Sequence, residues 1–370
     1  MTNDLAYWIG FSKVQGIGPA RLRKLLDYFG QIEAAWQADP GELAAMGLDK
    51  RSITGLAQAR QTVDLEAELR RVEAASVTVL TWDDPAYPPL LRHIPDPPFV
   101  LYVRGTLLPR DEWALAVVGT RSASVYGKEA THHLASGLAA QQVTIVSGLA
   151  VGIDTQAHRS ALDVGGRTIA VLGCGVDIVY PAQNAKLAQE IIERGALVSD
   201  YPLGVKPDSR NFPPRNRIIS GLSLGVLMVE GDEQSGAKIT VDYALEQGRE
   251  VFAVPGNIFN RGSRGPNQLI QQGAKLITGL NDILEELNLT MVVQHAAVKE
   301  VMPDTPAEAA ILKYLSAEPT HIDDLGSQTG LAAAELSSTL TMMELKGQIR
   351  QVGGMNYVIA RETNVRYIVE

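Results

Sequence analysis

The chain has 370 residues, of which 45% are hydrophobic and 20% charged, a composition typical of globular proteins and sufficient for two or three domains. Its formal net charge is −9, which excludes a protein that coats nucleic acid through bulk charge and confines any nucleic-acid site to a local basic surface. No apolar run reaches the roughly 20 residues that span a bilayer, and residues 1–4 lack the basic start of a secretion signal, so we expect a cytoplasmic protein with no membrane partner.

Residues 1–70 read as a small helical domain. Gly16-Ile17-Gly18-Pro19 precedes a helical pattern at residues 20–29, and a further helix is expected at residues 52–60. The Gly-Ile-Gly turn resembles the hairpin of helix-hairpin-helix (SAM-like) modules, whose backbone amides hold a DNA phosphate. An ordinary helical turn explains the same residues, so DNA contact by this segment stays an open alternative.

Residues 75–288 alternate apolar strands with amphipathic helices. Strands are predicted at residues 77–82, 99–103, 115–118, 144–147, 167–172, 197–199, 224–229 and 251–254, and helices at 127–141, 155–164, 184–194 and 237–247. Short apolar strands that are each followed by a helix indicate an α/β domain with a mostly parallel sheet covered on both faces. Ligands of such sheets bind beyond the carboxyl ends of the strands.

Several loops at those strand ends are rich in glycine and hydroxyl side chains. Residues 119–124 follow the strand at 115–118, residues 147–154 the strand at 144–147, and residues 230–236 the strand at 224–229. Glycine lets the backbone approach an anion closely, and serine or threonine adds a donor. We therefore predict an anion-binding surface that contains Gly119, Arg121, the Ser147-Gly148 loop and the Ser235-Gly236 loop.

The sequence Asn211-Phe212-Pro213-Pro214-Arg215-Asn216-Arg217 is the strongest candidate site. A proline suits the first turn of a helix, so the stretch predicts a loop-to-helix junction with free backbone donors beside two cations. Lys206 and Arg210 lie just upstream. Cations around an aromatic side chain are typical of sites that neutralise phosphates and stack bases. The alternative is that Arg215 and Arg217 are solvated charges or ion-pair partners.

Motifs of common catalytic and cofactor sites are absent or incomplete. Gly173-Cys174-Gly175 lacks the third glycine of a dinucleotide fingerprint, and no Walker sequence is present. We expect no cofactor. Asp154 and His158, four residues apart, allow a metal or acid–base pair, but a capping carboxylate hydrogen-bonded to a partly buried histidine is the preferred interpretation. The single cysteine, Cys174, excludes an internal disulfide and a cysteine-based zinc site.

The C-terminal segment reads as a winged-helix domain at residues 305–362, after a linker at 290–304. Helices are predicted at residues 306–316, 321–328 and 332–346, followed by a hairpin whose strands, at 349–352 and 355–359, flank Gly353-Gly354. The third helix carries a single lysine, Lys346, which suits a major groove poorly. Protein contact or self-association is the expected role of this tail.

Ordered sequence blocks across residues 75–285 resemble the DNA-processing protein A family (DprA/Smf). They include Gly119-Thr120-Arg121, Ser147-Gly148-Leu149-Ala150, Tyr180-Pro181, Phe212-Pro213-Pro214-Arg215-Asn216-Arg217, Ser235-Gly236 and Ala253-Val254-Pro255-Gly256. The resemblance implies an extended Rossmann-like core that binds single-stranded DNA without sequence specificity or known enzymatic chemistry. It also implies a homodimer formed through that core and delivery of the strand to the RecA recombinase during natural transformation.

The family pattern assigns the phosphate pocket to Arg121, Ser147, Gly148, Phe212, Arg215, Arg217, Ser235 and Gly236. Lys238 stands where relatives often have an apolar residue, and we expect it to add a cation to the groove. Arg215 and Arg217 point in different directions because they lie two residues apart at a helix start. We narrowly favour Arg217 as the residue that contacts DNA and Arg215 as the partner in a structural ion pair.

A nucleotide hydrolase of the phosphoribohydrolase type is the competing hypothesis. Those enzymes share this general architecture and need a catalytic arginine and glutamate near a Pro-Gly-Gly-x-Gly-Thr loop. Here Pro255-Gly256-Asn257-Ile258 lacks the second glycine and the threonine.

Overall fold

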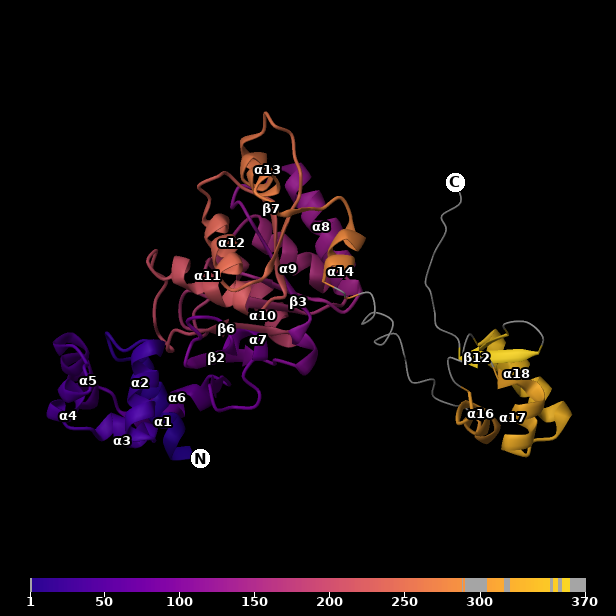
Figure 1. The fold of residues 1–370 in the computed structure, drawn as a ribbon, viewed down its shortest axis with the longest axis horizontal. Helices are drawn as coiled ribbons and strands as arrows, with labels where there is room; N and C mark the ends of the chain where they lie inside the picture. The colour runs from indigo at the N-terminus through magenta and orange to yellow at the C-terminus, as the bar shows by residue number, and fades with distance from the viewer. Residues whose placement is uncertain are drawn as a thin grey trace. The chain divides into compact units, whose positions relative to one another are not determined.

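A nine-stranded sheet organises most of the chain (Figure 1). The computed structural model describes residues 2–287, 289, 305–315, 320–346, 349–351 and 355–359. Contacts divide the chain into two units, Met1–Leu287 and Asn288–Glu370, and each is described by itself. Within the described residues, none of the helices combines the length and hydropathy needed to cross a membrane.

Six short helices form the start of the first unit, and aspartates cap three of them. They are α1 (Thr2–Ser12), α2 (Pro19–Phe29), α3 (Ile32–Gln37), α4 (Pro40–Ala45), α5 (Lys50–Thr62) and α6 (Leu65–Ala74). Asp49 and Asp64 accept the backbone N–H groups of Ser52 and Ala67 at the starts of α5 and α6. Asp39 accepts that of Gly41 in α4.

These helices share a hydrophobic core with one face of the sheet. Trp8 and Leu25 belong to the same buried cluster as Tyr102 and Leu197, which lie on two sheet strands. The Tyr102 hydroxyl is 2.8 Å from that of Ser12 at the end of α1. Residues 1–70 and 75–288, which the sequence divides into two domains, therefore pack together as one unit.

The sheet has the order β1-β2-β6-β5-β4-β3-β7-β8-β9. Its strands are β1 (Thr78–Thr81), β2 (Val100–Gly105), β3 (Ala114–Gly119), β4 (Thr144–Ser147), β5 (Thr168–Val171), β6 (Ala196–Ser199), β7 (Gly225–Glu230), β8 (Glu250–Ala253) and β9 (Lys275–Leu276). Pairings from β6 to β9 are parallel, while β1–β2 and β2–β6 are antiparallel. The predicted mostly parallel sheet is confirmed, and its continuous apolar strands are buried on both faces, as parallel sheets require.

Two groups of helices cover the sheet. The helices α8 (Val125–Ala140), α9 (Ile153–Asp163) and α10 (Ala185–Arg194) follow β3, β4 and β5 and pack in succession, whereas α11 (Phe212–Gly221) packs on α12 (Gly236–Glu246). Right-handed crossovers place these groups on opposite faces. The chain order reverses at β3, which has β4 on one side and β7 on the other. Parallel sheets bind ligands at such a reversal.

Shorter elements complete the first unit. They are α7 (Pro89–Arg92), α13 (Arg264–Gln271), α14 (Leu280–Glu286) and the 3-10 helices η1 (Pro109–Glu112), η2 (Ala182–Asn184) and η3 (Arg261–Ser263).

The second unit has the predicted winged-helix layout. Its elements are α16 (Pro306–Leu312), β10 (Thr320–His321), α17 (Ile322–Thr329), α18 (Ala333–Leu345), β11 (Ile349–Gln351) and β12 (Asn356–Ile359). The three strands pair antiparallel in the order β10-β12-β11, so the wing gains a strand that the sequence did not reveal. Lys346 pairs with Glu308 at 2.7 Å. The predicted linker at 290–304, Ser316, Gly353-Gly354 and residues 360–362 lie outside the described residues.

Candidate functional site

A cavity of about 650 Å³ opens beside the carboxyl end of β3, at the reversal of strand order. Its walls come from loops that follow five different strands, β3 to β7, and from the helices α11 and α12. The lining residues are Val118, Gly119, Thr120, Arg121, Ala150, Asp154, Tyr180, Pro207, Ser209, Phe212, Pro213, Arg215, Asn216, Ile219, Ser235, Gly236, Ala237, Ile239 and Thr240.

Two arginines give the cavity its positive charge. Arg121 is exposed at the end of the β3 loop, and among the described residues it has neither an ion pair nor a hydrogen bond through its guanidinium. Arg215 is only 6% exposed. Its guanidinium donates to the carbonyl oxygen of Gly148 at 2.9 Å and to that of Val171. Burial lowers the pKa of Arg215, and the carboxylate of Asp154 opposes that shift. Among its described lining residues, the cavity thus holds one fixed cation, Arg215, and one free cation, Arg121.

An aromatic pair forms one wall of the cavity. The rings of Phe212 and Tyr180 stack with centroids 5.5 Å apart and planes at 29°, and the guanidinium carbon of Arg215 lies 5.9 Å from the Phe212 centroid. Phe212 begins α11, whose first turn holds Pro213 and Pro214 as the sequence predicts. The Tyr180 ring is 48% exposed and offers a face on which a flat ligand can stack. The sequence analysis did not predict Tyr180 as a site residue. The signal available in the sequence was an aromatic residue directly before a proline, in the loop after β5.

The N-terminus of α12 supplies donors on the opposite side. The Ser235 hydroxyl is buried and, among the described residues, has no hydrogen-bond partner. Gly236 is exposed, and its carbonyl accepts a hydrogen bond from the Asn216 side chain at 3.3 Å. Free backbone N–H groups and the helix dipole favour an anion at such a terminus. An unsatisfied hydroxyl beside them is the donor that a phosphate oxygen requires.

A buried carboxylate counterbalances Arg215. Asp154 accepts the backbone N–H groups of Gly148 at 3.1 Å and Ala150 at 3.3 Å. Burial raises the pKa of Asp154 to about 6, although Arg215 acts in the opposite direction. His158 bonds Thr168 rather than Asp154, with Nδ1 at 2.6 Å from the hydroxyl, and burial lowers its pKa to about 3. The predicted capping role of Asp154 is wrong, because α9 begins at Ile153 without a side-chain cap and the carboxylate holds the loop before the helix instead. The predicted bond to a partly buried histidine is also wrong, because His158 is fully buried and bonds Thr168.

The structure separates the predicted site residues into two groups. Gly119, Arg121, Phe212, Arg215, Asn216, Ser235 and Gly236 line the cavity, whereas Ser147, Gly148, Lys206, Arg210, Arg217 and Lys238 do not.

Most of the predicted site residues that do not line the cavity have their polar atoms bonded to other parts of the protein. The Ser147 hydroxyl donates to the carbonyl of Val117 at 2.7 Å, and Gly148 is tied to Asp154 and Arg215. Arg210 pairs with Asp208 at 2.8 Å, and Lys238 pairs with Asp242 at 2.6 Å.

The exposed Lys206 is absent from the cavity wall, although Pro207 and Ser209 belong to it. Sequence proximity alone did not reveal which way these side chains point.

Arg217 makes the structural ion pairs that the sequence analysis gave to Arg215. Its guanidinium contacts Asp200 at 3.0 Å and Asp96 at 3.3 Å. Burial lowers the pKa of Arg217, but Asp200 and Asp96 more than offset this effect and the net shift is upward. The two residues leave α11 in different directions, as predicted, but the assignment is reversed: Arg215 faces the cavity and Arg217 faces the two aspartates.

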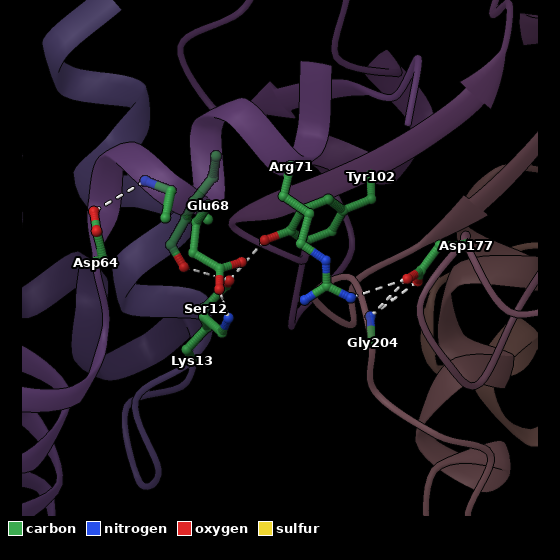
Figure 2. Close-up of polar contacts among 10 residues, drawn as sticks. Ser12, Lys13, Asp64, Glu68, Arg71, Tyr102, Asp177 and Gly204 are labelled. Carbon is green, nitrogen blue, oxygen red and sulfur yellow. Dashed lines mark hydrogen bonds and ion pairs between the residues drawn. The ribbon is translucent and has the colours of Figure 1, made fainter. Parts of the chain in front are cut away.

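The N-terminal helices are tied to a loop that lines the cavity. Figure 2 shows Arg71 of α6 directed at Asp177, with an ion-pair distance of 3.2 Å. The same carboxylate accepts the backbone N–H of Gly204 at 2.9 Å and 3.0 Å. Gly204 has φ of +82°, and a β-carbon there would lie 2.5 Å from the Arg71 guanidinium. The loop of residues 204–211, which includes the lining residues Pro207 and Ser209, is therefore held at its first residue by Asp177 and Arg71.

Loss of this contact is expected to weaken ligand binding at the cavity. Arg71→Ala should lower affinity for an anionic strand about three- to tenfold, while unfolding free energy falls by less than about 1 kcal/mol because the pair is partly exposed. Fluorescence titration and urea unfolding measure the two effects. Arg70→Ala is the matched control, since Arg70 lies beside Arg71 and its ion-pair partner among the described residues is the exposed Glu66. Equal affinities of the two variants would contradict the role of Arg71.

Titration of Asp154 is expected to tune the same site. Its protonated form is favoured below pH about 6, which removes a negative charge from the cavity wall. Affinity for an anionic strand should therefore rise as pH falls from 7.5 to 5. The gain is about tenfold for one charge at about 12 Å in an effective dielectric constant of about 20. Asp154→Asn should bind tightly at both pH values, and an Asn variant with the wild-type pH profile would exclude Asp154 as the titrating group.

Comparison with known proteins matches nearly the whole chain to one family. The family model "DNA recombination-mediator protein A" matches residues 78–288, and the "DprA winged helix domain" matches residues 295–355. Protein Smf of Synechocystis is 36% identical, with 96% of this chain and 98% of that protein covered. Protein Smf of Escherichia coli is 39% identical, with 90% and 92% covered.

Solved structures show the same relationship. The X-ray structure of DNA processing protein A from Streptococcus pneumoniae superimposes with a TM-score of 0.67 at 36% identity and covers 77% of this chain and 98% of its own. DNA processing protein A from Helicobacter pylori, described for its single-stranded DNA binding mode, gives a TM-score of 0.52 at 31% identity, with 58% and 96% covered. Together with the Rossmann-like sheet and the winged helix, these matches establish that the chain belongs to the DprA/Smf family of DNA-processing proteins.

Proposed function

We propose that this protein binds single-stranded DNA without sequence preference and delivers it to the RecA recombinase during DNA uptake and recombination in the cytoplasm. The observation that carries the DNA-binding part is the cavity itself, where Arg121, which has no ion pair among the described residues, lies with the Tyr180–Phe212 stack and the Ser235 hydroxyl. The cations and the helix terminus suit phosphates, and the ring faces suit bases. Neither kind of contact distinguishes one base sequence from another.

A binding function explains the cavity better than hydrolysis of a nucleotide. Asp154 is the one carboxylate among the described lining residues, and one of its oxygens, Oδ2, accepts two backbone N–H groups. Pro255 and Gly256 lie outside the described wall, and so does Glu230, whose carboxylate accepts the N–H of Ser124. A phosphoribohydrolase needs its glutamate and arginine around one substrate. Release of free base from AMP by the purified protein would nevertheless favour the hydrolase.

Arg121 is expected to contact a phosphate directly. Arg121→Ala should lower affinity about tenfold for oligonucleotides of any sequence. The plot of log K against log salt should become less steep by roughly 0.7, the value for one neutralised phosphate of a single strand. Arg210→Ala, which removes an exposed arginine outside the cavity wall, is the control. An unchanged salt slope would count against Arg121, and preference of the wild type for double strands would overturn the DNA-binding proposal.

RecA delivery and a homodimer are the parts of the proposal that rest on the family. A strand held by its phosphates in an open cavity keeps its neighbouring nucleotides accessible to a recombinase. The wild type should therefore shorten the lag before RecA begins ATP hydrolysis on DNA coated with single-strand-binding protein, and Arg121→Ala should not. A lag that the wild type leaves unchanged would contradict loading, and a monomeric mass in sedimentation at micromolar concentration would contradict the dimer.

A further inference from the structure

A second cavity, of about 630 Å³, lies in the N-terminal helices, away from the Rossmann-like site. One wall is the turn between α1 and α2, with Lys13 and Gln15, and the other is a face of α5 from Lys50 to Val63. The 13 residues of α5 extend over about 18 Å, because twelve steps of 1.5 Å separate Lys50 from Thr62. The cavity is therefore elongated and similar in volume to the first one.

The charge of this cavity is opposite to that of the whole protein. Lys13, Lys50 and Arg51 line it, and no aspartate or glutamate is among its described lining residues, although the chain contains 42 acidic and 33 basic residues. Lys50 and Arg51 are exposed, and neither forms an ion pair within the described part of the chain. Asp49, the nearby acid, is engaged with Arg21 and with the N–H of Ser52.

The position of these cations on α5 is unfavourable for the free protein. Lys50 and Arg51 are the first two residues of the helix, and no acidic residue occupies its first turn. The helix dipole places partial positive charge at that end, which the capping carboxylate of Asp49 offsets only in part, so two cations there still favour an added anion. A bound phosphate would contact both cations and the helix terminus.

The walls of the cavity are held rigidly. Gly55 allows α5 to approach the turn so closely that a β-carbon there would lie 2.4 Å from the carbonyl oxygen of Gln15. The Ser52 hydroxyl donates to the carbonyl of Gly16 at 3.0 Å. Lys13 is anchored by its ion pair with Glu68, shown in Figure 2. The Gly-Ile-Gly turn therefore packs on α5, and Lys13 and Gln15, which precede it, form one wall of a cationic groove.

We propose that this groove is a second DNA-binding site, which holds the phosphodiester backbone of a strand beyond the segment bound in the first cavity. The elongated shape and the cations at one end suit a polyanionic chain better than a compact nucleotide. Thr54, Gln58 and Thr62 continue along the groove as neutral hydrogen-bond donors. The proposal rests on the proposed DNA-binding function, and the backbone can come from a longer single strand or from an adjoining duplex.

The double variant Lys50→Ala/Arg51→Ala tests the groove in the full-length protein. Its affinity for an oligonucleotide of about six nucleotides, which fills one site, should equal that of the wild type. Affinity for a strand of about 30 nucleotides, or for a hairpin duplex with a single-stranded tail, should fall at least tenfold. The salt slope should decrease by about 1.4 if two contacts are to a single strand and by about 1.8 if they are to duplex. Lys186→Ala is the control, because Lys186 is an exposed helical lysine that lines neither described cavity.

The outcomes separate this inference from the proposed function. If the wild type binds long DNA and Arg121→Ala weakens it, but Lys50→Ala/Arg51→Ala matches the wild type on every substrate, the groove is not a DNA site. If the wild type fails to bind even long single strands, the proposed function fails first. A loss of affinity for long DNA equal to that of Lys186→Ala would reflect net charge alone and would also contradict the proposal that the groove binds DNA.

Discussion

Burial of the Arg215 guanidinium is the constraint on which the site depends. A guanidinium removed from water must satisfy its donors within the protein. Arg215 does so with the carbonyls of Gly148 and Val171, which belong to segments at the ends of neighbouring strands β4 and β5. It also places Asp154 and the Phe212 ring around one charge. One side chain of α11 thereby fixes the separation of two loops and the orientation of the aromatic wall.

The same constraint explains why the neighbouring arginine takes a structural role. Ion pairs with Asp96 and Asp200 hold Arg217 on the other side of α11 and link that helix to residues far away in the sequence. A buried cation with two carboxylates has little residual charge to offer a ligand, whereas Arg121 retains its full charge because no carboxylate among the described residues pairs with it. Function and support are thus divided among three arginines that look equivalent in the sequence.

Sequence patterns predicted the parts of the structure that depend on local periodicity. The buried strands from β3 to β8 and the helices between them follow from apolar runs and glycine punctuation, as does the proline-initiated start of α11. The direction of β2 and the third strand of the wing could not be predicted, because pairing partners leave little trace in short segments. For the site, the pattern located the loops but not the side-chain directions. Only tertiary contacts turn Ser147 inward, pair Lys238 with Asp242 and bring Tyr180 onto Phe212.

Arg121, which pairs with no carboxylate in the part of the chain that the structure describes, affects how a ligand arrives as well as how tightly it is held. On a protein of formal charge −9, a polyanion is repelled on approach to most of the surface. An exposed cation at the mouth of the cavity creates a local attractive region in that repulsive field. Encounters that begin on the acidic surface separate quickly, whereas those at a cationic site such as the carboxyl edge of β3 persist long enough to dock. The acidic surface thus favours collisions in which the polyanion meets the protein at the cavity, before any hydrogen bond has formed.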